Sequence, residues 1–347
     1  MEATPQQLKA LPPPLLAWYD ENRRVLPWRE QVSPYRTWVS EIMLQQTRVT
    51  AVLPYFDRFM AALPTVAALA DAPEQQLMSL WQGLGYYSRA RNLQKAAQVI
   101  MTRHGGVFPD TYEGLTALPG VGDYTAGAIA SIAFGQPVPA VDGNVLRLAA
   151  RLTGCDDNVL EPKTRARFRR WMAEVIPLDR PGAFNQALMD LGAMVCLPNG
   201  APLCEQCPAR TFCTACEKGL QRQLPVREKK TARRVEQSTV FLLRQEDAIA
   251  LRQRPATGLL AGLWEFPNVP GALTERQAAE QLAKWGLVPH QWGKSFADKH
   301  VFTHITWEMT VFTITVQGAG PPEWVWCPDK EREKYPMPTA FGKLEKE

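Results

Sequence analysis

The sequence has no long hydrophobic run and little net charge. No stretch approaches the roughly 18 consecutive apolar residues that span a bilayer, and the first ten residues, MEATPQQLKA, lack the basic and apolar segments of a secretory signal. These absences argue against a membrane or secreted protein and lead us to expect a cytoplasmic one. A net charge of only +4 does not by itself indicate a nucleic-acid partner.

Length and composition indicate a globular chain of more than one domain. A chain of 347 residues predicts two or three domains at about 150 residues each. Hydrophobic residues make up 46% and charged residues 21%, which excludes wholesale disorder. The change in pattern along the chain predicts a helical region at 1–220, a basic linker at 221–236 and an α+β region at 237–347.

Local periodicity supports this division. The first region holds amphipathic runs typical of helices at 37–53, 73–80, 89–103, 124–134 and 144–152. In the second region, two short apolar runs within 239–251 predict a β-hairpin that turns at 245–247. Residues at 305–315 alternate with period two, which predicts a half-buried strand.

Positive charge is concentrated in two segments. The sequence REKKTARR at 227–234 carries a single acid, and no acid interrupts the basic run at 163–170. Each segment is either a solvated surface or tether, or a set of contacts to DNA phosphates.

The sequence LPGVGDYTA at 118–126 precedes an apolar helix that ends near residue 135. Gly120 and Gly122 let the backbone approach another molecule closely, and Asp123 is a candidate cap of the following helix. The free amides of the turn and helix start form a site for one phosphate. The segment 118–135 resembles the helix-hairpin-helix element, which holds the DNA backbone without reading sequence.

Five of the seven cysteines lie close together, which predicts a metal site in a reducing compartment. They are Cys196, Cys204, Cys207, Cys213 and Cys216. Two pairs, Cys204/Cys207 and Cys213/Cys216, have zinc-knuckle spacing. Alternatively, the first four would bind an iron–sulfur cluster. Spacing alone does not decide between the metals, and Cys155 and Cys327 are interpreted as ordinary residues.

Several further motifs together resemble one family. LPGVGDYTAGAI, VDGNVLRLAAR and the cysteine loop at 196–216 are similar to the endonuclease III superfamily of helix-hairpin-helix DNA glycosylases. WVSEIMLQQTRV (38–49), WQGLGYYSRARNL (81–93), FNQALMDLGAMVC (184–196) and LLAGLWEFP (259–267) resemble adenine DNA glycosylase, the MutY family. These motifs cover nearly the whole chain and occur in the family's order.

The resemblance implies a fold, a cofactor and a substrate. It implies an all-α glycosylase domain with a [4Fe-4S] loop, followed by an α+β Nudix-like domain. The substrate would be duplex DNA with adenine opposite 8-oxoguanine or guanine. Apart from the resemblance, we expect a monomer, and the absence of transit or nuclear-targeting features favours a prokaryotic cytoplasmic enzyme at the nucleoid. The cluster ligands would be Cys196, Cys204, Cys207 and Cys213. Seven residues separate the first two where the family usually has six, and Cys216 is an additional candidate.

Adenine leaves poorly as an anion, so its excision requires a general acid and a carboxylate that stabilises the oxocarbenium-like sugar. The resemblance assigns these roles to Glu41 and Asp142, and gives Asn144 a role in orienting Asp142 or the attacking water. Glu41 lies at the edge of an apolar helical stripe, which predicts a raised pKa. The simpler alternatives are an interfacial Glu41 paired with an arginine such as Arg36 or Arg48, and an N-cap at Asp142.

Tyr124 occupies the place of a lysine that forms a Schiff base in lyase-competent relatives. Since tyrosine cannot do so, we expect a monofunctional glycosylase and no adduct trapped by borohydride. The target base must also be flipped from the duplex. By resemblance, Gln46 and Tyr86 enter the stack. The residues assigned to the adenine pocket are Trp28, Arg29 and Gln186.

The second domain resembles the Nudix-like domain of adenine glycosylases, where a Phe-Ser-His motif recognises 8-oxoguanine. This chain has Phe302, Thr303 and His304 at that place. The added methyl group of threonine restricts χ1, but its hydroxyl still donates and accepts hydrogen bonds. Only Glu275 and Glu280 fall within 274–285, so metal-dependent pyrophosphate hydrolysis is not expected.

Two alternatives remain at this point. One is an endonuclease III-like pyrimidine glycosylase and lyase, which Tyr124 and the appended domain disfavour. The other is a non-catalytic iron–sulfur protein that binds damaged DNA, which the presence of both Glu41 and Asp142 disfavours.

Overall fold

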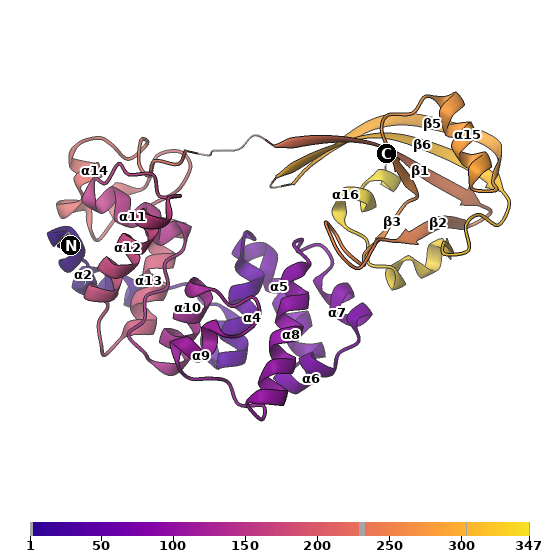
Figure 1. The fold of residues 1–347 in the computed structure, drawn as a ribbon. Helices are drawn as coiled ribbons and strands as arrows, with labels where there is room; N and C mark the ends of the chain where they lie inside the picture. The colour runs from indigo at the N-terminus through magenta and orange to yellow at the C-terminus, as the bar shows by residue number, and fades with distance from the viewer. Residues whose placement is uncertain (1–2, 229–232, 303, 347) are drawn as a thin grey trace. The chain divides into compact units, whose positions relative to one another are not determined.

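The computed structural model describes residues 3–228, 233–302 and 304–346 (Figure 1). Contacts within the chain divide it into two units, described separately below. The first unit comprises residues 1–71 and 91–229, and the second comprises 72–90 and 230–347. Among the described residues, no helix combines the length and apolar character needed to cross a bilayer.

The chain is helical up to its basic segment, as the periodicity predicts. The helices are α1 (Gln6–Lys9), α2 (Pro12–Asn22), α3 (Pro27–Glu30), α4 (Pro34–Leu44), α5 (Val49–Ala62), α6 (Val66–Asp71), α7 (Glu74–Trp81), α8 (Ser88–Arg103), α9 (Tyr112–Thr116), α10 (Asp123–Phe134), α11 (Gly143–Thr153), α12 (Pro162–Val175), α13 (Pro181–Met194) and α14 (Thr214–Glu217), with 3-10 turns η1 (Cys204–Gln206) and η2 (Arg210–Phe212). Helix α7 lies among the residues of the second unit.

Four helices of the first unit pack against one another in pairs and carry the site described below. Helix α10 packs against α4 and α13, and α11 packs against α13. Gly135 and Gly154 end α10 and α11 with φ of 66° and 68°, a conformation that glycine adopts without strain. This packing fixes the starts of α10 and α11 near the side chains of α4 and α13.

The helix expected at 37–53 is wrong as a continuous element. It is divided into α4 and α5 because Gln46 adopts a left-handed conformation with φ of 59°. The break leaves a turn at the end of α4 where the prediction had an uninterrupted apolar stripe.

The second unit contains a mixed sheet with helices on both faces. Its strands are β1 (Arg234–Gln245), β2 (Ala248–Gln253), β3 (Trp264–Glu265), β4 (Asn268–Pro270), β5 (Val288–Val301), β6 (Ile305–Gln317) and β7 (Val325–Pro328), with helices α15 (Glu275–Lys284) and α16 (Thr339–Gly342) and the 3-10 turns η3 (Asp329–Lys334) and η4 (Leu344–Lys346). The main strand order is β3-β2-β1-β6-β5, while β4 pairs with β1 and β7 with β2. Strands β1 and β6 are parallel, and the other pairs are antiparallel.

Alternation along β1 builds two cores, one on each face of the sheet. Val240 and Leu242 pack into the cluster that includes α16, whereas Phe241 and Leu243 face the cluster that includes α15. The hairpin predicted at 239–251 is confirmed as β1 and β2, and the strand predicted at 305–315 as β6. Strand β1 begins at Arg234, inside the segment expected to be a linker, and residues 229–232 of that segment lie outside the described residues. The domain limits 1–220, 221–236 and 237–347 stay predictions.

Candidate active site

One cavity of about 820 Å³ in the first unit collects most of the residues assigned to excision. The predicted residues among its lining are Trp28, Arg29, Glu41, Gln46, Tyr124, Asp142, Asn144 and Gln186. They come from segments far apart along the chain and meet because α4, α10, α11 and α13 pack together. We call this space the excision cavity.

Glu41 is a buried carboxylic acid with one direct partner. It lies on α4 with only 5% of its surface exposed, and its Oε2 accepts a hydrogen bond of 2.5 Å from the Tyr124 hydroxyl. Burial, reinforced by the nearby Asp142, raises the pKa of Glu41 to about 7, against the opposing effects of the Tyr124 hydrogen bond and Arg29. Arg36 donates instead to the carbonyl of Pro27, so it does not form the predicted alternative pair.

Tyr124 lies in the first turn of α10, where the helix-hairpin-helix segment delivers it to the cavity. Burial and the nearby carboxyl groups of Glu41 and Asp142 raise the pKa of its hydroxyl well above the ordinary value. The hydroxyl therefore stays protonated and serves as a donor to Glu41. Its oxygen also lies 3.6 Å from the sulfur of Met189.

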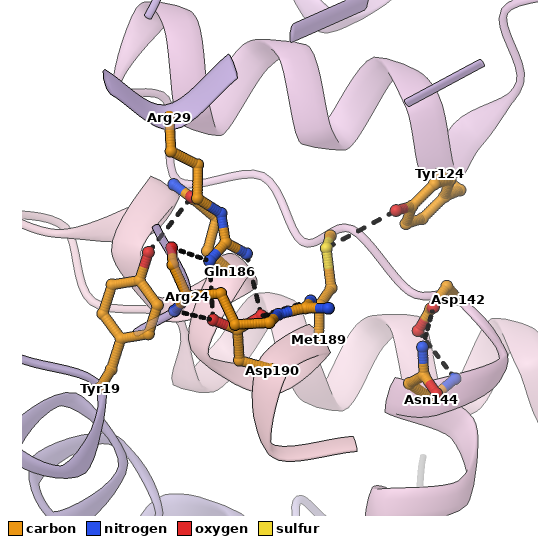
Figure 2. A network of polar contacts seen from close by, with 9 residues as sticks. All are labelled: Tyr19, Arg24, Arg29, Tyr124, Asp142, Asn144, Gln186, Met189 and Asp190. Carbon is orange, nitrogen blue, oxygen red and sulfur yellow. Dashed lines mark hydrogen bonds and ion pairs between the residues drawn. The ribbon is translucent and has the colours of Figure 1, made fainter. Parts of the chain in front are cut away.

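Asp142 is the N-cap of α11, as the simpler interpretation predicted. Its Oδ1 accepts hydrogen bonds of 2.8 Å from the backbone N–H groups of Asn144 and Val145, and its Oδ2 accepts one of 2.7 Å from the Asn144 amide (Figure 2). Burial raises the pKa of Asp142, while these hydrogen bonds favour its ionised form. The cap holds the carboxylate rigidly at the cavity wall.

The residues assigned to the adenine pocket, Trp28, Arg29 and Gln186, all line the excision cavity, and we call this part of its lining the adenine wall. Trp28 is buried and packs edge-to-face on Phe56, with ring centroids 5.1 Å apart. Gln186 accepts a hydrogen bond of 3.2 Å from the Tyr19 hydroxyl. Arg29 is bound to Asp190, a residue that the sequence analysis did not single out (Figure 2).

Two residues assigned to the DNA stack have unusual backbones. Gln46 in the first unit and Tyr86 among residues 72–90 have φ of 59° and 49°, a region that non-glycine residues seldom adopt. Tyr86 is 46% exposed despite its size. Such strain is a common feature of functional positions.

In the helix-hairpin-helix turn, the structure requires glycine at position 120 but not at position 122. Gly120 has φ of +74°, and a Cβ there would lie 2.6 Å from Asn92, whereas a Cβ at Gly122 would meet open space. The expected capping by Asp123 is wrong, because Gly122 is the N-cap and has no side chain to bond the amides. Asp123 instead accepts hydrogen bonds from Tyr112 at 2.7 Å and Arg169 at 2.5 Å. The first amides of α10 thus lack a side-chain cap, as an anion site requires.

All five clustered cysteines line one small cavity between α11 and the loop that follows α13. Arg151 donates to the Cys196 sulfur at 3.2 Å. Among the described residues, no three His, Cys, Asp or Glu side chains converge on a single-ion site. Because all five cysteines line one cavity, their donor chemistry fits a thiolate-bound metal group.

Two buried arginines on α11 were also missed by the sequence analysis. Arg147 donates to the Asn144 amide oxygen at 2.9 Å and to the carbonyl of Cys196 at 2.9 Å. Arg151, one turn later, donates to the carbonyl of Leu197 at 2.8 Å. Their spacing of four residues within the apolar sequence VLRLAAR was the available signal, because a buried arginine needs partners.

In the second unit, the predicted recognition motif lies at the turn between β5 and β6. The Phe302 N–H donates to the carbonyl of Ile305 at 2.8 Å, and the Phe302 ring packs on Trp307 with centroids 4.8 Å apart. His304 is exposed, and Thr303 lies outside the described residues. On α15, Glu280 pairs with Arg276 at 3.6 Å.

Comparisons with known proteins agree with this geometry. The model of the HhH-GPD superfamily of base excision DNA repair proteins matches residues 39–174, and the NUDIX domain model matches 239–347. The chain is 36% identical to the adenine DNA glycosylase of Homo sapiens, over 95% of this chain and 72% of that protein. It is 35% identical to the adenine DNA glycosylase of Buchnera aphidicola subsp. Baizongia pistaciae, over 73% and 72% of the two chains.

A solved structure of a thermostable thymine-DNA glycosylase is 27% identical, with a TM-score of 0.55, and aligns with 62% of this chain and all of that one. Fold and cavity together define a helix-hairpin-helix glycosylase of base excision repair. The chain belongs to the adenine DNA glycosylase family. Its activity is therefore the removal of adenine from DNA, and the fold class predicted from the sequence is confirmed.

Proposed function

We propose that this glycosylase hydrolyses the bond between adenine and deoxyribose in duplex DNA where adenine is paired with 8-oxoguanine or guanine. The observation that carries the mechanism is the juxtaposition of a buried Glu41, held by Tyr124, with a hydrogen-bonded Asp142 in one cavity. Two carboxyl groups in such different surroundings suit an acid and an electrostatic stabiliser.

Glu41 acts as the general acid. In its protonated form it transfers a proton to the ring of the extruded adenine, so that the base departs as a neutral species. Tyr124 holds the carboxyl group in place through Oε2. Trp28, Arg29 and Gln186 form the wall against which the base is positioned.

Asp142 stabilises the positive charge that develops on the sugar as the bond breaks. Asn144 orients its carboxylate and, with it, the water that completes hydrolysis. No lysine occupies the position of Tyr124, so the reaction ends with release of adenine and an intact strand. The endonuclease III-like alternative requires a Schiff base, and a stoichiometric adduct trapped by borohydride would contradict this proposal.

The rate of excision is expected to fall as the pH rises. Glu41 must be protonated to act, and its pKa lies at about 7. The single-turnover rate should therefore be nearly constant below this pH and fall roughly tenfold for each pH unit well above it. The measurement is adenine release under saturating enzyme, with DNA affinity determined at each pH as the control. A rate that is constant from about pH 6 to 9 would contradict the assignment.

Access to the base requires that the nucleotide leave the duplex. We assign Gln46 and Tyr86 to the space that the flipped nucleotide leaves in the base stack. Their left-handed backbone conformations support side chains that are exposed and held in a fixed direction. The uncapped amides of α10, together with the open space beside Gly122, hold a neighbouring phosphate. These contacts position the strand without reading its sequence.

Recognition of 8-oxoguanine is assigned to Phe302, Thr303 and His304. His304→Ala should reduce the preference for adenine opposite 8-oxoguanine over adenine opposite guanine by roughly five- to tenfold, the worth of one hydrogen bond. Since His304 is exposed, the free energy of unfolding should not change. The measurement is the ratio of excision rates on the two duplexes.

A matched control is His290→Ala, which removes another exposed histidine from the strand that leads to the same turn. It should leave the preference unchanged. An unaltered ratio in His304→Ala would remove His304 from the recognition motif.

We propose that Cys196, Cys204, Cys207 and Cys213 bind a [4Fe-4S] cluster. The shared cavity, which all of these thiols line, supports a thiolate-bound group whose four ligands each bind a separate iron. When bound, the cluster supplies a rigid, thiolate-ligated centre for the loop. Iron and zinc analysis of the purified protein tests this, and a monomer on DNA is tested by sedimentation of the complex.

A further inference from the structure

A buried carboxylate that the sequence did not predict as a site residue contacts the adenine wall of the excision cavity without lining the cavity itself. The Asp190 side chain on α13 is 0% exposed and is in contact with two arginines (Figure 2). It binds Arg29 through both oxygens, at 2.7 and 3.0 Å, and accepts 2.7 Å from Nε of Arg24. A buried acid bound in this way is held in one orientation, and so are both guanidinium groups.

The same cluster continues to the residues that face the base. Gln186 precedes Asp190 by one turn of α13 and is hydrogen-bonded by Tyr19, whose ring lies 5.9 Å from the guanidinium carbon of Arg29. Arg24, Arg29 and Gln186 all line the excision cavity together with Glu41. Asp190 itself does not line it, so any effect on the reaction is transmitted through these neighbours.

A contribution to folding stability does not by itself explain why Asp190 is buried with Arg24 and Arg29. A buried ion pair often contributes no more than apolar residues of the same volume, because both charges lose their hydration. Here one acid faces two cations, which leaves a net positive charge beside the cavity. That charge lies in the surroundings of Glu41, whose other neighbouring groups are Tyr124 from α10 and Asp142 at the start of α11. Without Asp190, the charge beside Glu41 would double.

We propose that Asp190 is a positioning residue for adenine excision, which holds Arg29 in place among the residues that face the adenine and limits the positive charge that reaches Glu41. This inference rests on the proposed role of Glu41 as the acid. It assigns the pairing of Arg24 and Arg29 with Asp190 to catalysis, in addition to any contribution to folding.

The test is the pH profile of single-turnover excision by Asp190→Asn. Neutralising Asp190 leaves Arg24 and Arg29 uncompensated, which favours the ionised form of Glu41. The alkaline midpoint should therefore move to lower pH by about one unit, with a corresponding loss of about tenfold in rate above the wild-type midpoint. Affinity for the duplex should be retained. The control is Asp20→Asn, which removes the carboxylate paired with Arg180 at an exposed site.

A second variant gives the opposite sign. Arg24→Gln leaves one cation for one acid, and the midpoint should rise by about half a unit. Arg24 is partly exposed, so this variant decides the question if Asp190→Asn does not fold. Unchanged midpoints in folded variants, with lowered stability only, would overturn the inference. Failure of the proposed acid is recognised separately, because it would appear in the wild type as a rate independent of pH.

Discussion

Glu41→Gln is expected to lose adenine excision by about 10³-fold or more while still binding DNA. Glutamine has the shape of glutamic acid and its oxygen still accepts the Tyr124 hydroxyl, but it cannot transfer a proton at neutral pH. Because the carboxyl group is buried, no group from the solvent replaces it. The measurement is single-turnover release of adenine from a duplex containing adenine opposite 8-oxoguanine.

Glu21→Gln, on the exposed side of α2, is the matched control and should behave as the wild type. The Glu41 variant should also lose the alkaline decline in rate, since the titrating group is gone. Retention of excision within tenfold of the wild type would exclude Glu41 as the acid and favour a non-catalytic role for the buried carboxyl group.

Asp142→Asn should be the second most damaging change, with a loss of about 10² to 10³-fold in the rate of bond cleavage. Asparagine is as good an N-cap as aspartate, so its side-chain oxygen keeps the bonds to the amides of Asn144 and Val145. What disappears is the negative charge that faces the sugar. The variant should therefore keep the thermal stability of the wild type while its excision rate falls. Both quantities are measured on the same preparation.

Asp142→Ala completes this comparison. It loses the cap as well as the charge, and should cost about 1 kcal/mol of stability in addition to the rate. If the asparagine variant excised adenine normally while the alanine variant did not, Asp142 would be a structural cap only. The distinction depends on the hydrogen bonds at Oδ1, which the two substitutions treat differently.

Local sequence rules predicted much of this molecule. The helix ends at Gly135 and Gly154 and the alternation along β1 follow from properties of a few neighbouring residues. Glu41, Tyr124 and Asp142 were located because they lie within contiguous motifs. Their convergence in one cavity was implied only by resemblance, since no spacing rule relates α4 to α10 and α11.

What the sequence could not supply depends on partners distant in the chain. Asp123 has the composition of a cap, but Tyr112 and Arg169 compete for its carboxylate from other helices. Asp190 resembles an ordinary helix residue until Arg24 and Arg29, more than 160 positions earlier, are seen beside it. The break at Gln46 likewise reflects a backbone conformation that propensity does not foresee.

The buried arginines of α11 affect how variants of this protein should be interpreted. Arg147 donates both to the carbonyl of Cys196 and to the Asn144 amide, which in turn donates to Asp142. A continuous chain of hydrogen bonds therefore connects the cysteine loop to the catalytic carboxylate. A substitution in the loop can thus displace Asp142 and lower the excision rate, as an active-site substitution would, although the substituted residue does not line the excision cavity. Conversely, a normal excision rate is evidence that the loop has been assembled correctly.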